Sequence, residues 1–355
     1  MNKKAESGTK TKRAAAPRKA RGNPVKKAKP MGKARTRHGL CTLSDGRVLA
    51  IGGESGRGDV VRLKDCEIYD PSTDTWQACA SLPEPRIWPA LVALDEGRAM
   101  VIGGRAKDGF HHLADCLIWD PTTDVWQPSM AMAEKRGEPQ VVQLRDGRLL
   151  VGGGDANRPL PLEIWSPKSA EWSTESDPVD CFLLLGMGGG DALVVGDTDP
   201  GKCWTWCAEV KALEAASDVP FAGRRGAGTA LSDGRVMVAG GKGGSGLICE
   251  VGIFDPVSGS WQSASPLPQP RFGHRLQTLP DGVVLLLGGV DGDGVAPGVL
   301  CWDPAQDSWR EVGKLKKGRR FTETVVLDDG SCLVVGGAVP GGALHSAHCE
   351  RIVCV

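Results

Sequence analysis

The stretch "DGRVLAIGG" (residues 45–53) joins an Asp-Gly turn, a short apolar run and two glycines, and it recurs along the chain. Its clear copies are "EGRAMVIGG" (96–104), "DGRLLVGGG" (146–154), "DGRVMVAGG" (233–241), "DGVVLLLGG" (281–289) and "DGSCLVVGG" (329–337), and a degraded copy is "GGDALVVGD" (189–197). Repetition at a period of about 20–50 residues is typical of solenoids and propellers, and the β-branched, alternating texture of each unit favours strands over helices. We therefore expect seven copies of a small all-β unit.

Each unit predicts four short strands. The Asp-Gly turn connects a first strand to the apolar second strand, and a third strand ends in an aromatic residue and Asp-Pro, as in "LIWDP" (117–121). Asp-Pro favours a turn because proline fixes φ and donates no backbone hydrogen bond, while Asp can bond its own backbone. A fourth strand begins near a Trp. An Arg that opens the next unit follows ten residues after Trp76, Trp126, Trp261 and Trp309.

This combination of Gly-Gly, aromatic residue, Trp and a Pro-Arg or Lys-Arg junction resembles the kelch repeat of bacterial-type kelch proteins. The resemblance implies an all-β, seven-bladed kelch-type β-propeller over residues 25–355, in which the first strand of each blade lines a central channel. The blades are expected to start near residues 35, 86, 136, 182, 224, 271 and 319.

The last unit lacks a fourth strand of its own. Residues 319–355 supply three strands, and the chain ends where Asp-Pro would follow. When the repeat is counted back from Arg35, the Trp column falls on Val25 and the Leu column on Met31. We therefore predict that residues 25–33 form the outer strand of the seventh blade and close the ring.

The zero net charge hides two oppositely charged parts. Residues 1–37 carry a net charge of +13, and the remaining residues carry −13. Residues 1–24 are rich in Lys, Arg, Ala and Pro without any aromatic residue, which predicts a disordered tail. This tail could make weak, sequence-independent contacts with nucleic acid or an anionic surface, could fold back on the acidic propeller, or could only aid solubility.

The sequence predicts a cytoplasmic monomer. None of its apolar runs reaches the roughly 18 residues of a membrane-spanning helix, and no apolar stretch follows the first positive charges as in an export signal. Most of the twelve cysteines lie within expected strands at repeat-equivalent positions. We interpret most of them as reduced, buried and small hydrophobic residues.

A column of arginines opens the inner strands. Its members are Arg35, Arg86, Arg136, Arg224, Arg271 and Arg319. The resemblance implies that these positions lie near one mouth of the channel, where arginines of some kelch propellers hold acidic peptides. Guanidinium groups suit carboxylates because two parallel charge-assisted hydrogen bonds form at once. The alternative is structural, since each Arg could instead pair with an Asp or Glu across a blade junction.

The leading functional hypothesis is a non-catalytic scaffold whose blade-junction face binds an acidic segment of a partner protein. The sequence predicts no cofactor or metal, because kelch-like copper oxidases need further tyrosine and histidine ligands, whereas Tyr69 is the chain's only tyrosine. The alternative is a carbohydrate-acting isomerase, mutarotase or lyase with its site in the central channel. Glu138, two residues after Arg136, is the kind of channel-facing carboxylate that such acid/base chemistry would need.

Overall fold

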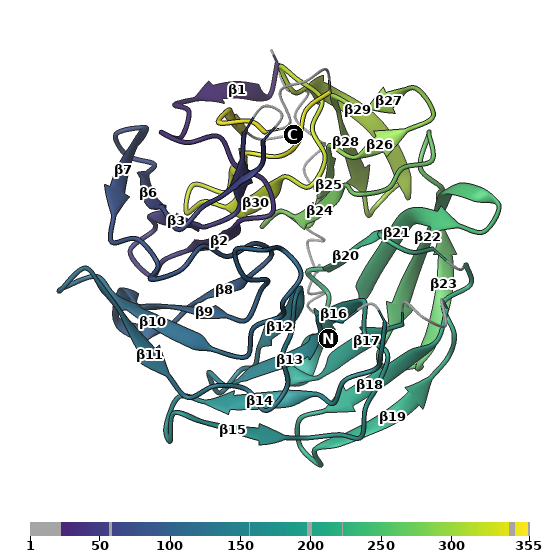
Figure 1. Cartoon of the computed structure of the whole chain (residues 1–355). Coiled ribbons are helices and arrows are strands. Elements are labelled where there is room, and N and C mark those ends of the chain that lie inside the picture. Colours follow the sequence, from purple (N-terminus) through teal and green to yellow (C-terminus); the bar gives the residue numbers. More distant parts are fainter. Residues whose placement is uncertain are drawn as a thin grey trace, which may run out of the picture.

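The computed structural model shows a ring of seven four-stranded antiparallel sheets around a central channel (Figure 1). It describes residues 23–56, 59–155, 157–196, 201–221, 223–340 and 345–353. The prediction of an all-β, seven-bladed propeller is confirmed. The contacts predicted for the basic tail concern residues that lie almost entirely outside the described ones.

Each blade runs from an inner strand at the channel to an outer strand at the rim (Figure 1). The inner strands are β2 (Gly39–Thr42), β8 (Ala90–Ala93), β12 (Pro139–Gln143), β16 (Leu183–Gly186), β20 (Ala227–Ala230), β24 (Arg275–Thr278) and β30 (Glu323–Val326). The second strands are β3 (Val48–Ile51), β9 (Ala99–Ile102), β13 (Leu149–Gly153), β17 (Ala192–Val195), β21 (Val236–Gly243), β25 (Val284–Leu287) and β31 (Cys332–Val335).

The outer half of each blade is a hairpin, except in the last blade. The third strands are β6 (Cys66–Asp70), β10 (Cys116–Asp120), β14 (Glu163–Ser166), β18 (Cys203–Cys207), β22 (Gly246–Asp255), β28 (Gly298–Asp303) and β32 (Cys349–Ile352). The outer strands are β7 (Thr75–Cys79), β11 (Val125–Ser129), β15 (Glu171–Thr174), β19 (Ala212–Ala216), β23 (Ser260–Ala264), β29 (Ser308–Lys314) and β1 (Val25–Ala28).

Small elements decorate two loops and two turns. The loop hairpins are β4 (Glu54–Ser55) with β5 (Val61–Arg62), and β26 (Val290–Asp291) with β27 (Gly294–Val295). Two short 3-10 helices, η1 (Asp95–Gly97) and η2 (Gly188–Gly190), replace the Asp-Gly turn in their blades. No helix in the described part of the chain is long and apolar enough to cross a membrane.

The second strands form the core of the ring. Side chains alternate along a strand, so Leu49 and Ile51 of β3 pack against blade 2, whereas Val48 and Ala50 pack against blade 7. All four of these residues are fully buried. A strand buried on both faces needs no polar alternation, which explains why the repeated apolar run is continuous.

The N-terminal strand closes the ring, as predicted. Strand β1 pairs antiparallel with β32, from Val25 opposite Ile352 to Ala28 opposite Cys349. Met31 is buried, and its backbone N–H donates to the carbonyl of Ala347 at 3.0 Å. The blade made of β30, β31 and β32 therefore gains its outer strand from the opposite end of the chain.

At the rim, each outer-strand Trp holds the preceding blade. Trp126 Nε1 donates to the carbonyl of Ala80 at 2.8 Å, and Asp124 Oδ1 accepts the N–H of Ala80 and the indole N–H of Trp119, both at 2.9 Å. The same indole-to-carbonyl bond joins Trp76 to Lys29, Trp172 to Met130, Trp261 to Ser217 and Trp309 to Ser265. We call this Asp and Trp arrangement the rim latch.

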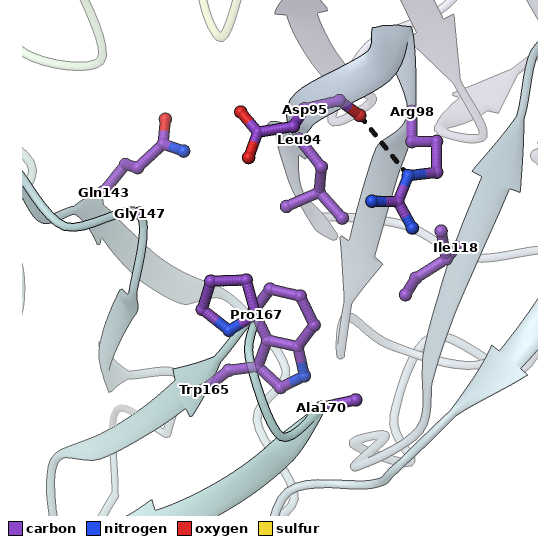
Figure 2. Close-up of a pocket in the computed structure, with 9 residues that line it drawn as sticks. All are labelled: Leu94, Asp95, Arg98, Ile118, Gln143, Gly147, Trp165, Pro167 and Ala170. Atoms are coloured by element: carbon purple, nitrogen blue, oxygen red, sulfur yellow. Dashed lines mark hydrogen bonds between the residues drawn. The ribbon is translucent and has the colours of Figure 1, made fainter.

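The latch is incomplete between blades 2 and 3, beside a hollow of about 100 Å³. Figure 2 shows the residues that line it. Ala170 occupies the position that Asp124 holds in blade 2, two residues before the outer Trp. Trp165 Nε1 is buried there without a hydrogen-bond acceptor among the described residues. The hollow therefore marks a missing carboxylate, and its small volume makes it a packing defect of the repeat.

Ala170→Asp is expected to raise the free energy of unfolding by about 0.5–1.5 kcal/mol, because the new carboxylate accepts the indole N–H of Trp165. Ala170 has φ of 57°, a left-handed conformation that Asp tolerates better than Ala. Urea unfolding followed by tryptophan fluorescence measures the change. Ser169→Asp adds the same charge to the same turn and should leave stability nearly unchanged. A less stable Ala170→Asp protein would contradict the latch interpretation.

Candidate functional site

The strand order separates two faces of the ring. Because the four strands of a blade alternate in direction, the links between blades and the loops from second to third strands emerge on one face. We call this the junction face. It carries the two long loops at residues 54–65 and 105–115. The Asp-Gly and Asp-Pro turns lie on the opposite face, which we call the turn face.

Five arginines of the predicted column lie inside the blades. Arg35, Arg86, Arg136, Arg271 and Arg319 have exposed fractions between 0% and 3%. In each of them, one terminal guanidinium nitrogen donates to the carbonyl of the first glycine of the Gly-Gly pair, seventeen residues later. The side chain therefore joins the end of the second strand to the start of the third.

An acidic residue completes each of these sites. The ion pairs are Arg35–Glu67 (2.5 Å), Arg86–Asp115 (2.5 Å), Arg136–Glu163 (2.9 Å), Arg271–Asp291 (3.8 Å) and Arg319–Glu350. Side chains this deeply buried offer no surface to a partner, and their terminal guanidinium nitrogens already contact backbone carbonyls and carboxylates. The geometry favours the structural alternative for these five arginines, and we leave them out of the proposed binding surface.

Arg224 is out of register with the other five. Its backbone bridges Lys242, and the equivalent bridges in other blades start one residue after the column, at Thr36 and Phe272. Gly223 therefore occupies the column position in blade 5, and Arg224 is exposed. The repeat spacing placed Arg224 wrongly because Leu213, which lies opposite Trp206, replaces the outer-strand Trp from which the ten residues are counted.

A second set of arginines lines the junction-face mouth of the channel. Arg37 and Arg105 both stack on the indole ring of Trp88, with guanidinium carbons 4.2 Å and 4.7 Å from its centroid. Arg37 also lies 5.9 Å from the ring of Phe321, and Arg320 lies 5.4 Å from it. We define the mouth cluster by its residues: Arg37, Trp88, Arg105, Glu138, Arg225, Arg320 and Phe321.

The backbone presents this cluster in an unusual conformation. Arg37, Trp88, Arg225 and Phe321 have φ between 51° and 57°, and the equivalent residue of blade 6 is Gly273, at 64°. Only glycine adopts this left-handed region without cost, and bulky residues held there concentrate at ligand-binding sites. Hydrogen bonds between neighbouring blades hold it, including Trp88 N to Arg37 O at 2.7 Å and Phe321 N to Gly273 O at 3.2 Å.

Glu138 lies among these arginines. Its carboxyl group is exposed to the channel yet closely enclosed by the channel walls. This enclosure raises the pKa of Glu138, although the positive charges of Arg105 and Arg225 act in the opposite direction. On the inner strands of blades 6 and 7, Arg275 forms an ion pair with Glu323. The mouth therefore combines an excess of positive charge with one carboxyl group that protonates more readily than usual.

The sequence contains a pattern that marks some of these residues, although the predicted arginine column did not include them. Arginine recurs one or two positions after the column in "RTR" (35–37), "GRR" (223–225) and "RR" (319–320). Spacing alone does not reveal which arginine of such a pair points into the blade and which points to the channel. Arg105 directly follows a Gly-Gly pair, and no arginine recurs at this position in the other repeats, so the repeat pattern does not indicate it.

Apolar side chains are exposed on the two long loops beside the mouth. Phe110 is 82% exposed and Val61 is 57% exposed. The loops contact each other, because Arg62 donates to the carbonyl of Lys107 at 2.9 Å. Arg62 also lies opposite Glu54 in the β4–β5 hairpin, and Glu54 accepts a hydrogen bond from Arg37 at 2.6 Å. Hydrogen bonds and strand pairing thus link the two loops to Arg37 of the mouth cluster.

The blade geometry and the repeated Gly-Gly, Trp and Arg contacts define a kelch-type β-propeller. The model of the kelch motif matches residues 34–83 and 223–268. The chain therefore contains kelch motifs, as the sequence resemblance implied.

Curated relatives match a limited part of the chain. Kelch-like protein 35 of Mus musculus is 42% identical over 83 residues, which are 23% of this chain and 14% of that protein. Beta-scruin of Limulus polyphemus is 38% identical over 74 residues, which are 21% of this chain and 8% of that protein. The chain thus matches only a small fraction of the length of these relatives.

A solved structure shares the whole architecture. A fungal alcohol oxidase of the AA5 family, in complex with copper, superimposes with a TM-score of 0.72 at 16% identity, over 93% of this chain and 76% of that chain. The prediction that the protein is not an enzyme is therefore corrected: the same fold is that of an enzyme, so the propeller gives no ground for excluding catalysis. At this identity the likeness shows the fold alone.

The residues present do not match a copper site of the kind that the kelch-like oxidases need. Tyr69 is fully buried, and its hydroxyl donates to Asp74 at 2.8 Å within the first blade. Across the described ranges, no three His, Cys, Asp or Glu side chains converge as a metal site would require. We derive no step that involves copper.

Proposed function

We propose that the protein binds an acidic segment of a partner protein at the mouth cluster on the junction face. The observation that carries this proposal is the set of large residues held in the left-handed conformation around the channel mouth. Such a conformation costs free energy of order 1–3 kcal/mol per residue and persists where it serves a purpose. Here it aims guanidinium and aromatic groups at one point.

The electrostatics favour an anionic ligand. Arg37, Arg105 and Arg225 lie near the carboxyl group of Glu138, and Arg37 also pairs with Glu54, so positive charges still outnumber negative ones at the mouth. Among the described residues, Arg105 has no carboxylate within ion-pair distance, and its guanidinium lies over the indole of Trp88. Stacking on Trp88 fixes the orientation of both guanidinium groups before a ligand arrives, which reduces the entropic cost of binding.

The neighbouring loops suggest the rest of the ligand. An acidic residue that reaches the mouth places its chain neighbours over Phe110 and Val61, whose exposed side chains can bury apolar groups. Loops on a rigid scaffold are the usual carriers of binding specificity. We therefore expect a segment in which acidic residues stand beside aliphatic or aromatic ones.

A displayed peptide library tests this proposal. The immobilised propeller is expected to enrich peptides that contain Asp or Glu next to apolar residues, and raising the salt concentration should weaken their binding. Enrichment of neutral or basic peptides, or of none, would contradict it. Competition between the enriched peptides shows whether they share one site.

A second candidate function is acid/base chemistry on a small sugar in the channel. Glu138 favours it, because a carboxyl group with a raised pKa can hold and deliver a proton nearer to neutral pH. Arg275 and the hydroxyls of Thr229 and Thr278, which lie 2.9 Å apart, provide hydrogen-bonding groups on the inner strands.

Glu138→Gln separates the two candidates. If the mouth binds acidic peptides, removing this negative charge should raise their affinity by a factor of about 2–10, measured by isothermal titration. If the channel carries acid/base chemistry, the same substitution should abolish turnover of the sugar. Glu96→Gln changes the charge of a residue on the turn face and should affect neither quantity. Weaker peptide binding by Glu138→Gln would contradict the proposed electrostatics.

A further inference from the structure

Two cysteines face each other in the outer hairpin of blade 1. Cys66 begins β6 and Cys79 ends β7, and the two residues are directly paired in the antiparallel register. Directly opposite residues project to the same face of a sheet, with Cα atoms about 4.5–5.5 Å apart. A disulfide accepts Cα separations of about 4.4–6.8 Å, so no backbone movement is needed to join them.

Blade 1 alone has a cysteine on both sides of this position. The equivalent pairs are Cys116 with Ser129 in blade 2, Cys203 with Ala216 in blade 4, Val251 with Ala264 in blade 5, Val299 with Gly313 in blade 6 and Cys349 with Ala28 in blade 7, and in blade 3 the third-strand position is held by Leu162, directly before β14. A small hydrophobic residue on the third strand is therefore enough for packing. Cys79 packs partly against the core, in a position that smaller residues such as Ala216 and Ala264 fill in other blades.

The thiols are in contact, and one of them is accessible. Cys66 is 1% exposed, while Cys79 is half-buried at the rim, and both are free thiols. The contact with the Cys66 thiol, together with burial, raises the pKa of Cys79. A reagent therefore reaches Cys79 first, and its reaction speeds up as the pH rises and the thiolate forms.

We propose that Cys66 and Cys79 are a modification site that forms a reversible intramolecular disulfide with a small-molecule disulfide as oxidant. The Cys79 thiolate attacks one sulfur of the oxidant, expels a thiolate and forms a mixed disulfide. The Cys66 thiolate then attacks Sγ of Cys79, which forms the Cys66–Cys79 bond and expels the second thiolate. The two protons lost by the protein end on the two small thiols released, and an excess of those thiols reverses the exchange.

The location gives this disulfide a structural consequence. Cys79 directly precedes Ala80, whose backbone is hydrogen-bonded to Asp124 and Trp126 of blade 2. Cys66 directly follows the long loop at 54–65. Closing the hairpin reduces the conformational freedom of the unfolded chain, so the oxidised protein should have the higher Tm. This inference does not depend on the proposed binding function.

Peptide mapping provides the test. The purified full chain is incubated with oxidised glutathione at mildly alkaline pH, denatured, alkylated and digested with trypsin. Cys66 and Cys79 share one tryptic peptide, residues 65–86, which contains no internal Lys or Arg. We expect this peptide to escape alkylation and to weigh two hydrogen atoms less than the dithiol, and to return to the dialkylated form after treatment with excess reduced glutathione.

Matched controls come from the same digest. Cys116, whose cross-strand neighbour is Ser129, is the only cysteine of tryptic peptide 108–135 and should remain alkylated. Cys79→Ser should leave Cys66 alkylated and remove the oxidation-dependent rise in Tm, while Cys116→Ser should leave that rise intact. Full alkylation of both cysteines in peptide 65–86 after this treatment, or a Tm rise that persists in Cys79→Ser, would overturn the proposal.

Discussion

Replacing Arg136 with alanine is expected to lower the free energy of unfolding by about 3–5 kcal/mol, because the substitution leaves a buried carboxylate without its counter-charge. Arg136 and Glu163 are both 0% exposed, and the guanidinium also donates to the carbonyl of Gly153 at 2.8 Å. Glu163 in turn accepts the backbone N–H of Ala133 at 2.7 Å. Urea unfolding followed by tryptophan fluorescence measures the loss.

Arg148→Ala is the matched control for this experiment. Arg148 also pairs with an acid, Asp146, at 2.6 Å, but this pair lies on a solvent-exposed Asp-Gly turn. Exposed ion pairs contribute only about 0–1 kcal/mol, so the control should unfold nearly like the wild type. Equal effects of Arg136→Ala and Arg148→Ala would contradict a structural role for the buried column.

The double substitution Arg37→Ala/Arg105→Ala is expected to reduce the affinity for the selected acidic peptides by about 100-fold. Each guanidinium offers charge-assisted hydrogen bonds, which contribute about 1.5–3 kcal/mol apiece, and about 1.4 kcal/mol corresponds to a factor of ten. Both groups stack on Trp88, so removing one loosens the other. Isothermal titration at fixed salt measures the change.

Arg47→Ala provides the comparison, since Arg47 lies on the turn face and pairs with Asp45 at 2.8 Å. It should bind the peptides as the wild type does. The double variant should also keep the thermal unfolding transition of the wild type, which separates lost binding from lost structure. Unchanged affinity in a folded double variant would refute binding at the mouth cluster.

The fold was predictable because its information is repeated. The blades reuse the same turn and apolar strand, and five of them the same Trp, so an error in one copy is corrected by the others, and even the ring closure follows from alignment with Val25 and Met31. The register of the arginine column failed at Arg224 in blade 5, because Leu213 replaces the anchoring Trp in the outer strand of blade 4. The register of a blade can be predicted from the sequence only where the residue that marks the repeat, here the outer-strand Trp, is present.

The site was less predictable for a physical reason. Arg35 and Arg37 are two residues apart, yet one is buried in a blade and the other faces the channel mouth. The left-handed backbone at Arg37, with φ of 57°, decides this difference, and neither residue type signals such a conformation. Stacked Arg and Trp side chains from separate blades become visible only once the ring is assembled.

The pairing of β1 with β32 also determines how the ring responds to tension. Val25, the first residue of β1, lies opposite Ile352, the last residue of β32. The chain therefore enters β1 and leaves β32 at the same end of this strand pair. A pulling force applied to the two ends would peel these strands apart one hydrogen bond at a time instead of shearing them all together. The propeller should therefore be mechanically weak at this seam, and an optical-tweezers trace should show the seventh blade opening first at low force.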